Sequence, residues 1–156
     1  METMLVSYLR KYKKLSVLIL CLPFIVGFMA IQVNDIYTVS GSCEVQDEGV
    51  LFIYIVDSEC FKRPMTGLKT VSTKVVLGKS HTKKVDFSFA GIPKGTYGIR
   101  CFLDKDGNKK LNRGMFGPTE PWGMSFKQGR TAGIPTFLEI SFKVDKSVEN
   151  LIIHVK

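Results

Sequence analysis

The stretch that decides the fold is GVLFIYIVDS, residues 49–58. Its even-numbered residues from Val50 to Val56 and its odd-numbered residues from Leu51 to Ile55 are all apolar. Successive side chains of a β-strand point to opposite faces, so this segment would present apolar side chains on both. We therefore expect a strand that lies centrally in a sheet or is covered on both faces.

The period of two continues on both sides of this stretch. QDEG, residues 46–49, reads as a hairpin turn after a first strand near 37–45. About seven short strands without a crossing helix predict an all-β fold, an antiparallel β-sandwich of immunoglobulin-like or transthyretin-like type. The other expected strands are 70–77, 83–90 with Val85, Phe87 and Phe89 inward, 96–103, 136–144 with Leu138, Ile140, Phe142 and Val144 inward, and 149–155 with Leu151, Ile153 and Val155 inward.

An apolar segment precedes the strands. Residues 15–33, LSVLILCLPFIVGFMAIQV, carry no charge and follow the cations Arg10, Lys11, Lys13 and Lys14. This order predicts an N-terminal hydrophobic helix in residues 1–33, acting as a signal peptide or an uncleaved signal anchor. A buried helical hairpin is a third interpretation of this segment. Residues 34–41 would then be a linker and 42–156 the sandwich domain, which the basic head directs to the outer side of the cytoplasmic membrane.

The net charge and the cysteines indicate whether the chain would bind nucleic acid or zinc and whether it could form disulfides. The formal charge of the 156-residue chain is +8, without an arginine-rich tract, and an exported domain of this kind is not expected to bind nucleic acid. Cys43, Cys60 and Cys101 lie outside the apolar segment and show no zinc-type spacing. In an oxidising compartment an odd number of cysteines leaves at least one thiol free or intermolecular, and the pairing stays open.

The long connection after the fifth expected strand carries oxygen ligands at alternate positions. Asp104, Asp106 and Asn108 could turn their oxygens toward one centre, as calcium requires. The sixth loop position, where an EF-hand has glycine, is Lys109, and the twelfth, where it has glutamate, is Met115. The alternative is an Asx-type turn without an ion. The candidate calcium ligands are Asp104, Asp106, Asn108 and Asn112.

The second half of this connection is FGPTEPWGMS, residues 116–125. Its prolines stiffen the backbone and hold Glu120 and Trp122 in place. Glu120 could complete a metal shell or pair with a cation such as Arg100. Trp122 could stack a ligand or plug the open end of the sandwich.

The order of these segments resembles a bacterial family of exported proteins, domain of unknown function 2141. The resemblance rests on GIPKGTYGIRCFLDKDGNKKLN, FGPTEPWGMS and GIPTFLEISFKV and covers about residues 42–156. It implies an exported sandwich of unknown activity. Lys109 stands where the family usually has glycine, and Asn112 where it usually has aspartate. The matching positions are Asp104, Asp106, Asn108, Asn112, Glu120, Pro121, Trp122, Gly123, Ser125, Pro135 and Phe137.

The sequence contains few candidate catalytic residues, because it has only two histidines and no sequence motif of a catalytic nucleophile. We therefore expect a non-catalytic module of the cell envelope, which is periplasmic, extracellular or anchored to the membrane. Its loop 104–134 is expected to bind a partner or to stabilise the sandwich. Glu120, Trp122 and Ser125 are its candidate ligand-binding residues, and envelope carbohydrate, peptide or protein its candidate partners. The alternatives are a membrane-tethered structural subunit, anchored through residues 15–33, and a weak hydrolase using Asp104 and Glu120.

Overall fold

In the computed structural model the deciding stretch forms strand β2, Gly49–Val56, in the middle of a sheet. The structure describes residues 35–63, 67–78, 81–126 and 135–156. β2 pairs antiparallel with β3, Lys69–Val75, on one side and with β5, Gly95–Asp104, on the other. β8, Trp122–Met124, extends this sheet beyond β5, and the short β9, Phe142–Val144, pairs with the beginning of β5.

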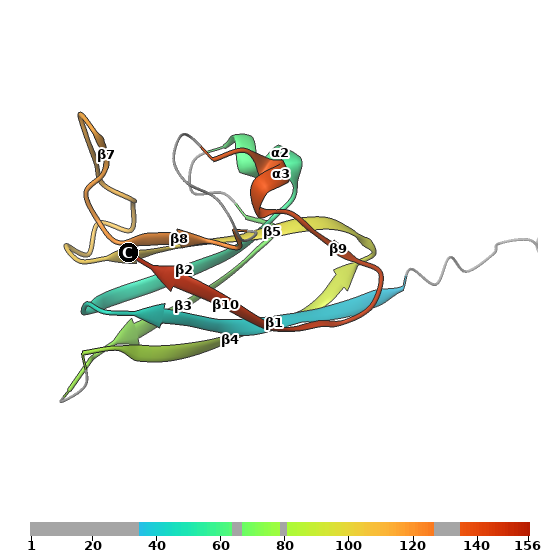
Figure 1. The fold of residues 1–156 in the computed structure, drawn as a ribbon, viewed down its shortest axis with the longest axis horizontal. Coiled ribbons are helices and arrows are strands. Elements are labelled where there is room, and N and C mark those ends of the chain that lie inside the picture. The colour runs from blue at the N-terminus through green and yellow to red at the C-terminus, as the bar shows by residue number, and fades with distance from the viewer. Residues whose placement is uncertain (1–34, 64–66, 79–80, 127–134) are drawn as a thin grey trace, which may run out of the picture. The chain divides into compact units, whose positions relative to one another are not determined.

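The second sheet has the order β10-β1-β4. β1, Ile36–Val45, pairs antiparallel with β4, Lys83–Pro93, and parallel with β10, Val148–Val155. The two sheets face each other as the layers of a sandwich (Figure 1). The all-β sandwich predicted from the sequence is confirmed, with one parallel strand pair that period-two reasoning does not anticipate.

The core fills the space between the two sheets. Val85, Phe87 and Phe89 of β4 are buried there, as their alternation predicts. β2 contributes Leu51, Ile53 and Ile55 to the same core.

A second apolar cluster lies on the other face of β2, where Tyr54 and Val56 pack with Phe102 and Ile140. Two short helices, α2 (Ser58–Lys62) and α3 (Phe137–Ile140), lie over this outer face, as Figure 1 shows. β2 is therefore covered on both sides, which explains why both of its side-chain sets are apolar.

The expected strand 136–144 begins as a helix instead. The Glu139 carboxylate accepts hydrogen bonds from the backbone N–H (2.6 Å) and the hydroxyl (2.7 Å) of Thr136, the capping residue of α3. This local capping of a helical turn overrides the alternating pattern. Leu138, expected to point inward, is 74% exposed, whereas Ile140 and Val144 are buried as expected.

The first strand begins at Ile36, inside the segment 34–41 that we expected to be a linker, and from there it pairs with β4. The expected apolar helix of residues 15–33 lies outside the described residues. Among the described residues, no helix has both the length and the hydropathy needed to cross a bilayer.

Candidate functional site

Two buried carboxylates hold the loop that connects β5 to β8. Asp104, at the end of β5, accepts hydrogen bonds from the backbone N–H groups of Gly107 (2.8 Å) and Lys109 (2.9 Å). Glu120, just before β8, accepts from the N–H groups of Lys105 (2.9 Å) and Asn112 (3.0 Å). Both side chains are at least 94% buried, because Asp104 is 2% exposed and Glu120 6%. Glu120 therefore joins the first and last parts of the loop, and it does so through backbone N–H groups rather than by pairing with Arg100.

The exposed part of the loop has a polar network of its own. The Asp106 carboxylate accepts hydrogen bonds from the Asn108 N–H (3.0 Å), the Asn108 amide (2.9 Å) and the Asn112 amide (2.7 Å). The Asn108 amide also donates to the Asn112 carbonyl oxygen at 2.8 Å. These donors, led by the Asn108 N–H, hold the pKa of Asp106 below its ordinary value.

The backbone of Lys109 has a left-handed conformation, with φ of 61°. Glycine adopts this region without a steric penalty, and other residues adopt it at a cost. Lys109 occupies the position at which an EF-hand has its glycine. Lys109 therefore has the backbone conformation that favours glycine at this position.

Two of the four predicted calcium ligands, Asp104 and Asp106, lie close to Glu120. One carboxylate oxygen from each of Asp104, Asp106 and Glu120 lies within 4.8 Å of the others. Oxygen ligands at this separation suit a hard cation such as calcium. Each of these oxygens already accepts an N–H donor, however, which is the geometry of the Asx-type alternative. Calcium binding here stays a prediction.

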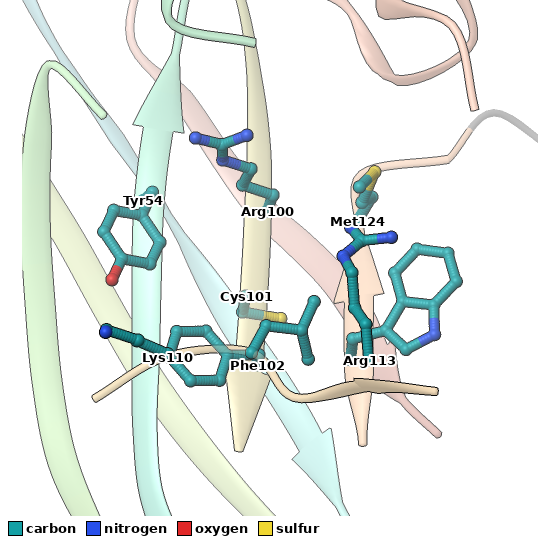
Figure 2. Close-up of a pocket in the computed structure, with 9 residues that line it drawn as sticks. Tyr54, Arg100, Cys101, Phe102, Lys110, Arg113 and Met124 are labelled. Atoms are coloured by element: carbon teal, nitrogen blue, oxygen red, sulfur yellow. The ribbon is translucent and has the colours of Figure 1, made fainter. Parts of the chain in front are cut away.

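The loop crosses the outer face of the β3-β2-β5-β8 sheet and encloses a cleft of about 320 Å3. Figure 2 shows the wall of the cleft formed by Tyr54 of β2 and by Arg100 and Phe102 of β5, with Lys110 and Arg113 coming from the loop. Trp122 and Met124 of β8 complete the sheet side, and Leu111 lines the loop side. Arg100, Phe102, Trp122 and Met124 share one face because they alternate along adjacent strands.

The aromatic wall of the cleft is packed on the sheet. The ring of Phe102 stacks with the rings of Phe52 (5.1 Å between centroids) and Tyr54 (6.3 Å). Trp122 meets Phe126 edge-on at 6.1 Å. Trp122 is half-buried, so its indole is partly packed and partly exposed to the cleft. The half-buried indole is compatible with either role, plug or platform, so both stay predictions.

β8 is fixed to both sheets. The backbones of Trp122 and Lys156 exchange two hydrogen bonds, of 2.9 and 3.0 Å. At Gly123 a Cβ atom would lie 2.5 Å from the backbone oxygen of His154, so only glycine permits this close approach. The wall that carries Trp122 is therefore held by main-chain contacts, which keep the indole at a defined position.

Arg100 places a positive charge at one end of the cleft. Its guanidinium donates hydrogen bonds to the carbonyl of Arg63 (2.8 Å) and, more weakly, to that of Cys60 (3.4 Å). It also lies over the ring of Tyr54, 5.9 Å from the centroid. Burial lowers the pKa of Arg100 from its ordinary value. A bound anion nearby would favour the charged form of this side chain.

A second cavity of about 380 Å3 shares four lining residues with the first. The shared residues are Leu111, Arg113, Trp122 and Met124. Phe116, at the tip of the hairpin formed by β6 (Arg113–Gly114) and β7 (Gly117–Pro118), also lines it and is 99% exposed. The two cavities together extend along the same aromatic and cationic surface.

The predicted ligand-binding residues have separate roles. Trp122 lines both cavities, whereas Glu120 holds the loop backbone. The Ser125 hydroxyl donates to the carbonyl of Ile140 (2.7 Å) and accepts from the N–H of Ile99 (2.8 Å), so it fastens β8 to β5 and to α3. Sequence reasoning did not select the other wall residues. Arg100 and Phe102 alternate along β5, and this spacing indicates that they share one face of the strand. It does not indicate that the loop crosses that face.

A family model described as "Uncharacterized protein conserved in bacteria (DUF2141)" matches residues 43–151. This range includes the cleft, the loop, the β3-β2-β5-β8 sheet and β4, together with the end of β1 and the beginning of β10. No curated protein and no solved structure matches the chain.

Proposed function

The chain belongs to the bacterial DUF2141 family, and from that premise we propose that it is an exported, non-catalytic binding module whose cleft takes an anionic ligand with an apolar or aromatic body. One observation carries this proposal. Among the described residues that line the cleft, Arg100, Lys110 and Arg113 are cationic and none is a carboxylate.

The aromatic and aliphatic lining supports the apolar half of the ligand. The half-buried indole of Trp122 offers aromatic surface, and Leu111 and Met124 offer aliphatic surface. The buried rings of Tyr54 and Phe102 complete the apolar lining. Small-molecule sites combine such walls with a few placed polar groups. A cavity of about 320 Å3 accommodates a compact ring system.

The cations support the anionic half. Lys110 and Arg113 are exposed at the rim, and Arg100 lies deeper with its pKa lowered by burial. Rim charges attract an anion over distance, and a buried cation binds it more strongly because the local dielectric constant is lower. A carboxylate, sulfonate or phosphate attached to a ring would match both the cations and the apolar lining of the cleft.

The hydrogen bonds of the loop carboxylates support the proposal that the module is non-catalytic. Asp104 and Glu120 each accept two backbone N–H groups, which fixes the loop and leaves their oxygens engaged. A general acid or base must instead reach the proton of a substrate.

Trp122 is the only tryptophan in the chain, so tryptophan fluorescence reports on the surroundings of this one residue, which lines the cleft and the adjoining cavity. We expect anilinonaphthalene sulfonate, an anionic aromatic probe, to quench this emission saturably, and a neutral naphthyl alcohol of similar size to bind more weakly. Arg113→Gln and Lys110→Gln should each weaken sulfonate binding about two- to fivefold, as expected for exposed charge pairs. Lys84→Gln, an exposed cation on β4 of the other sheet, serves as the matched control.

Equal affinity for the sulfonate and the alcohol would contradict the anionic chemistry. Absence of any saturable binding by a folded chain would contradict the cleft as a site. Trp122→Ala removes the reporter, so calorimetry replaces fluorescence for that variant. If the ligand stacks on the indole, this variant loses binding without losing thermal stability, whereas an equal loss of stability indicates a plug.

Export is tested by the mass and location of the chain in cells. A mature chain that begins near residue 31 has lost most of the apolar segment and keeps all of β1, which supports a released module. A start near residue 41 would also remove the first half of β1. An intact chain in the membrane fraction, with the domain accessible to external protease, supports tethering through residues 15–33. An intact chain in the cytoplasm would overturn export.

A further inference from the structure

Two cysteines from opposite sheets face each other in the core. Cys43 lies in β1 and Cys101 in β5, and their sulfur atoms are 4.0 Å apart. Both side chains are buried, at 0% and 4% exposure, in the cluster between the sheets. The two positions are 58 residues apart in the sequence, so only the folding of the sandwich brings them together.

The neighbours of the two cysteines fix their positions. Cys43 is in register with Val85 of β4 and Ile153 of β10, so it lies in the central strand of its sheet. Cys101 is in register with Ile53 of β2 and Gly123 of β8. Both strands are therefore held on two sides, and their facing side chains stay opposite each other.

Cys60 cannot take part without rearrangement of the sheet. It lies in α2, packed against the cluster on the outer face with Tyr54 and Phe102. The β3-β2-β5-β8 sheet separates that cluster from the core that contains Cys43 and Cys101.

We infer that Cys43 and Cys101 form a disulfide across the core when the chain folds in an oxidising compartment, and that Cys60 remains a thiol. The sulfur atoms must approach from 4.0 Å to a bond length of about 2.05 Å, and both side chains already point into the same core. The bond would join the two sheets covalently and settle the odd cysteine count left open by the sequence.

The oxidant is a small or protein-borne organic disulfide. One cysteine thiolate attacks a sulfur of this disulfide, forms a mixed disulfide and releases one thiolate. The second cysteine thiolate then attacks the cysteine sulfur of the mixed disulfide and releases the other thiolate. The protein loses two hydrogen atoms as protons and two electrons, and the oxidant is reduced to two thiols.

The exchange occurs before the sheets close. In the folded, reduced protein the hydrogen bond with Cys43, together with burial, raises the pKa of the Cys101 thiol well above its ordinary value. A thiol is unreactive toward disulfides, and the core excludes the oxidant. The bridge therefore forms during folding, and the proposed export is needed only to supply the oxidising compartment in cells.

The test uses the full chain and the variant Cys21→Ser/Cys60→Ser, which keeps only the facing pair. Each protein is unfolded under reducing conditions, refolded in a buffer of reduced and oxidised glutathione, alkylated in denaturant and mapped by mass spectrometry. We expect one linked peptide pair, Cys43 with Cys101, in both proteins, with Cys60 of the full chain alkylated. Reductant should then lower the melting temperature of both proteins by roughly 10 °C or more, as expected for a long closed loop.

The matched control is Cys43→Ala/Cys101→Ala, whose melting temperature should not respond to reductant. Complete alkylation of Cys43 and Cys101 in chains that refold in the glutathione buffer would overturn the proposal, as would a bridge that includes Cys60. This refolding experiment does not depend on export. A bridge formed in the buffer, but absent from chains isolated from cells, would locate the failure in the proposed export and leave the disulfide chemistry supported.

Discussion

Replacing Glu120 with alanine removes the carboxylate that joins the two ends of the loop above the cleft. Its oxygens accept the backbone N–H groups of Lys105 at 2.9 Å and Asn112 at 3.0 Å, and the side chain is 6% exposed. Alanine offers neither N–H group an acceptor, so water must replace the carboxylate. We expect both a loss of stability and a loosened cleft.

The size of the loss follows from the two hydrogen bonds. A hydrogen bond to a charged group contributes about 1.5–3 kcal/mol to stability. Lys105 is exposed and Asn112 half-buried, so water can reach their N–H groups and the lower value applies to each. Glu120→Ala should therefore lower the free energy of unfolding by about 3 kcal/mol. For a domain of this size that corresponds to roughly 12 °C in melting temperature.

Urea unfolding measures this loss, followed by circular dichroism for the sheets and by Trp122 emission for the cleft. Glu120→Gln should lie between wild type and alanine, because the amide keeps one oxygen acceptor but turns an N–H donor toward the other backbone N–H. Glu149→Ala, an exposed acid on β10, should stay within about 0.5 kcal/mol of wild type. A loss below about 1 kcal/mol for Glu120→Ala would refute the reasoning, because two hydrogen bonds to a charged carboxylate should together contribute about 3 kcal/mol.

Three further predictions concern the loops and the short helix. Lys109→Gly should raise stability by about 0.5–1 kcal/mol, because it removes the left-handed strain at φ 61° and adds a smaller entropy cost; a lower urea midpoint would contradict this. The Asp57 carboxylate caps α2 by accepting the Cys60 N–H at 2.7 Å, which lowers its pKa from 3.8, so its contribution is present above that pH and is lost as pH falls through the lowered value. Asp57→Asn keeps the cap but should weaken this acid dependence, and identical urea midpoints against pH for both proteins would exclude the effect. Micromolar calcium should leave the melting temperature equal to that in chelator, because N–H donors occupy the Asp104, Asp106 and Glu120 oxygens, whereas a rise would show sensor-grade binding to the native state.

The strands were predictable because the alternation of apolar and polar residues that indicates a strand is a local property of the sequence. Val85, Phe87 and Phe89 alternate with polar residues, and such a pattern buries one face wherever the strand lies. The double apolar pattern of β2 likewise predicted that both of its faces are covered. The pattern failed at 136–144, where the capping of α3 by Thr136 and Glu139 competes with alternation and exposes Leu138.

The candidate site was predictable only in part. The side chains of Asp106, Asn108 and Asn112 meet through hydrogen bonds because they belong to one tight loop, whereas their role as calcium ligands stays a prediction. Glu120 was selected as a ligand residue, and the structure places it as the support of the loop backbone. Whether a polar oxygen meets an N–H group or a ligand depends on chain segments that local spacing does not locate.

The sequence by itself determined the alternation of buried and exposed side chains and the oxygen-rich loop, since each depends on neighbouring residues. The tertiary structure alone decided that Tyr54, Arg100, Trp122 and Arg113 line one cleft and that Cys43 faces Cys101. These residues belong to strands and loops far apart in the chain. Their meeting depends on strand order and register and on which sheet each strand joins, and burial of the whole core fixes these together.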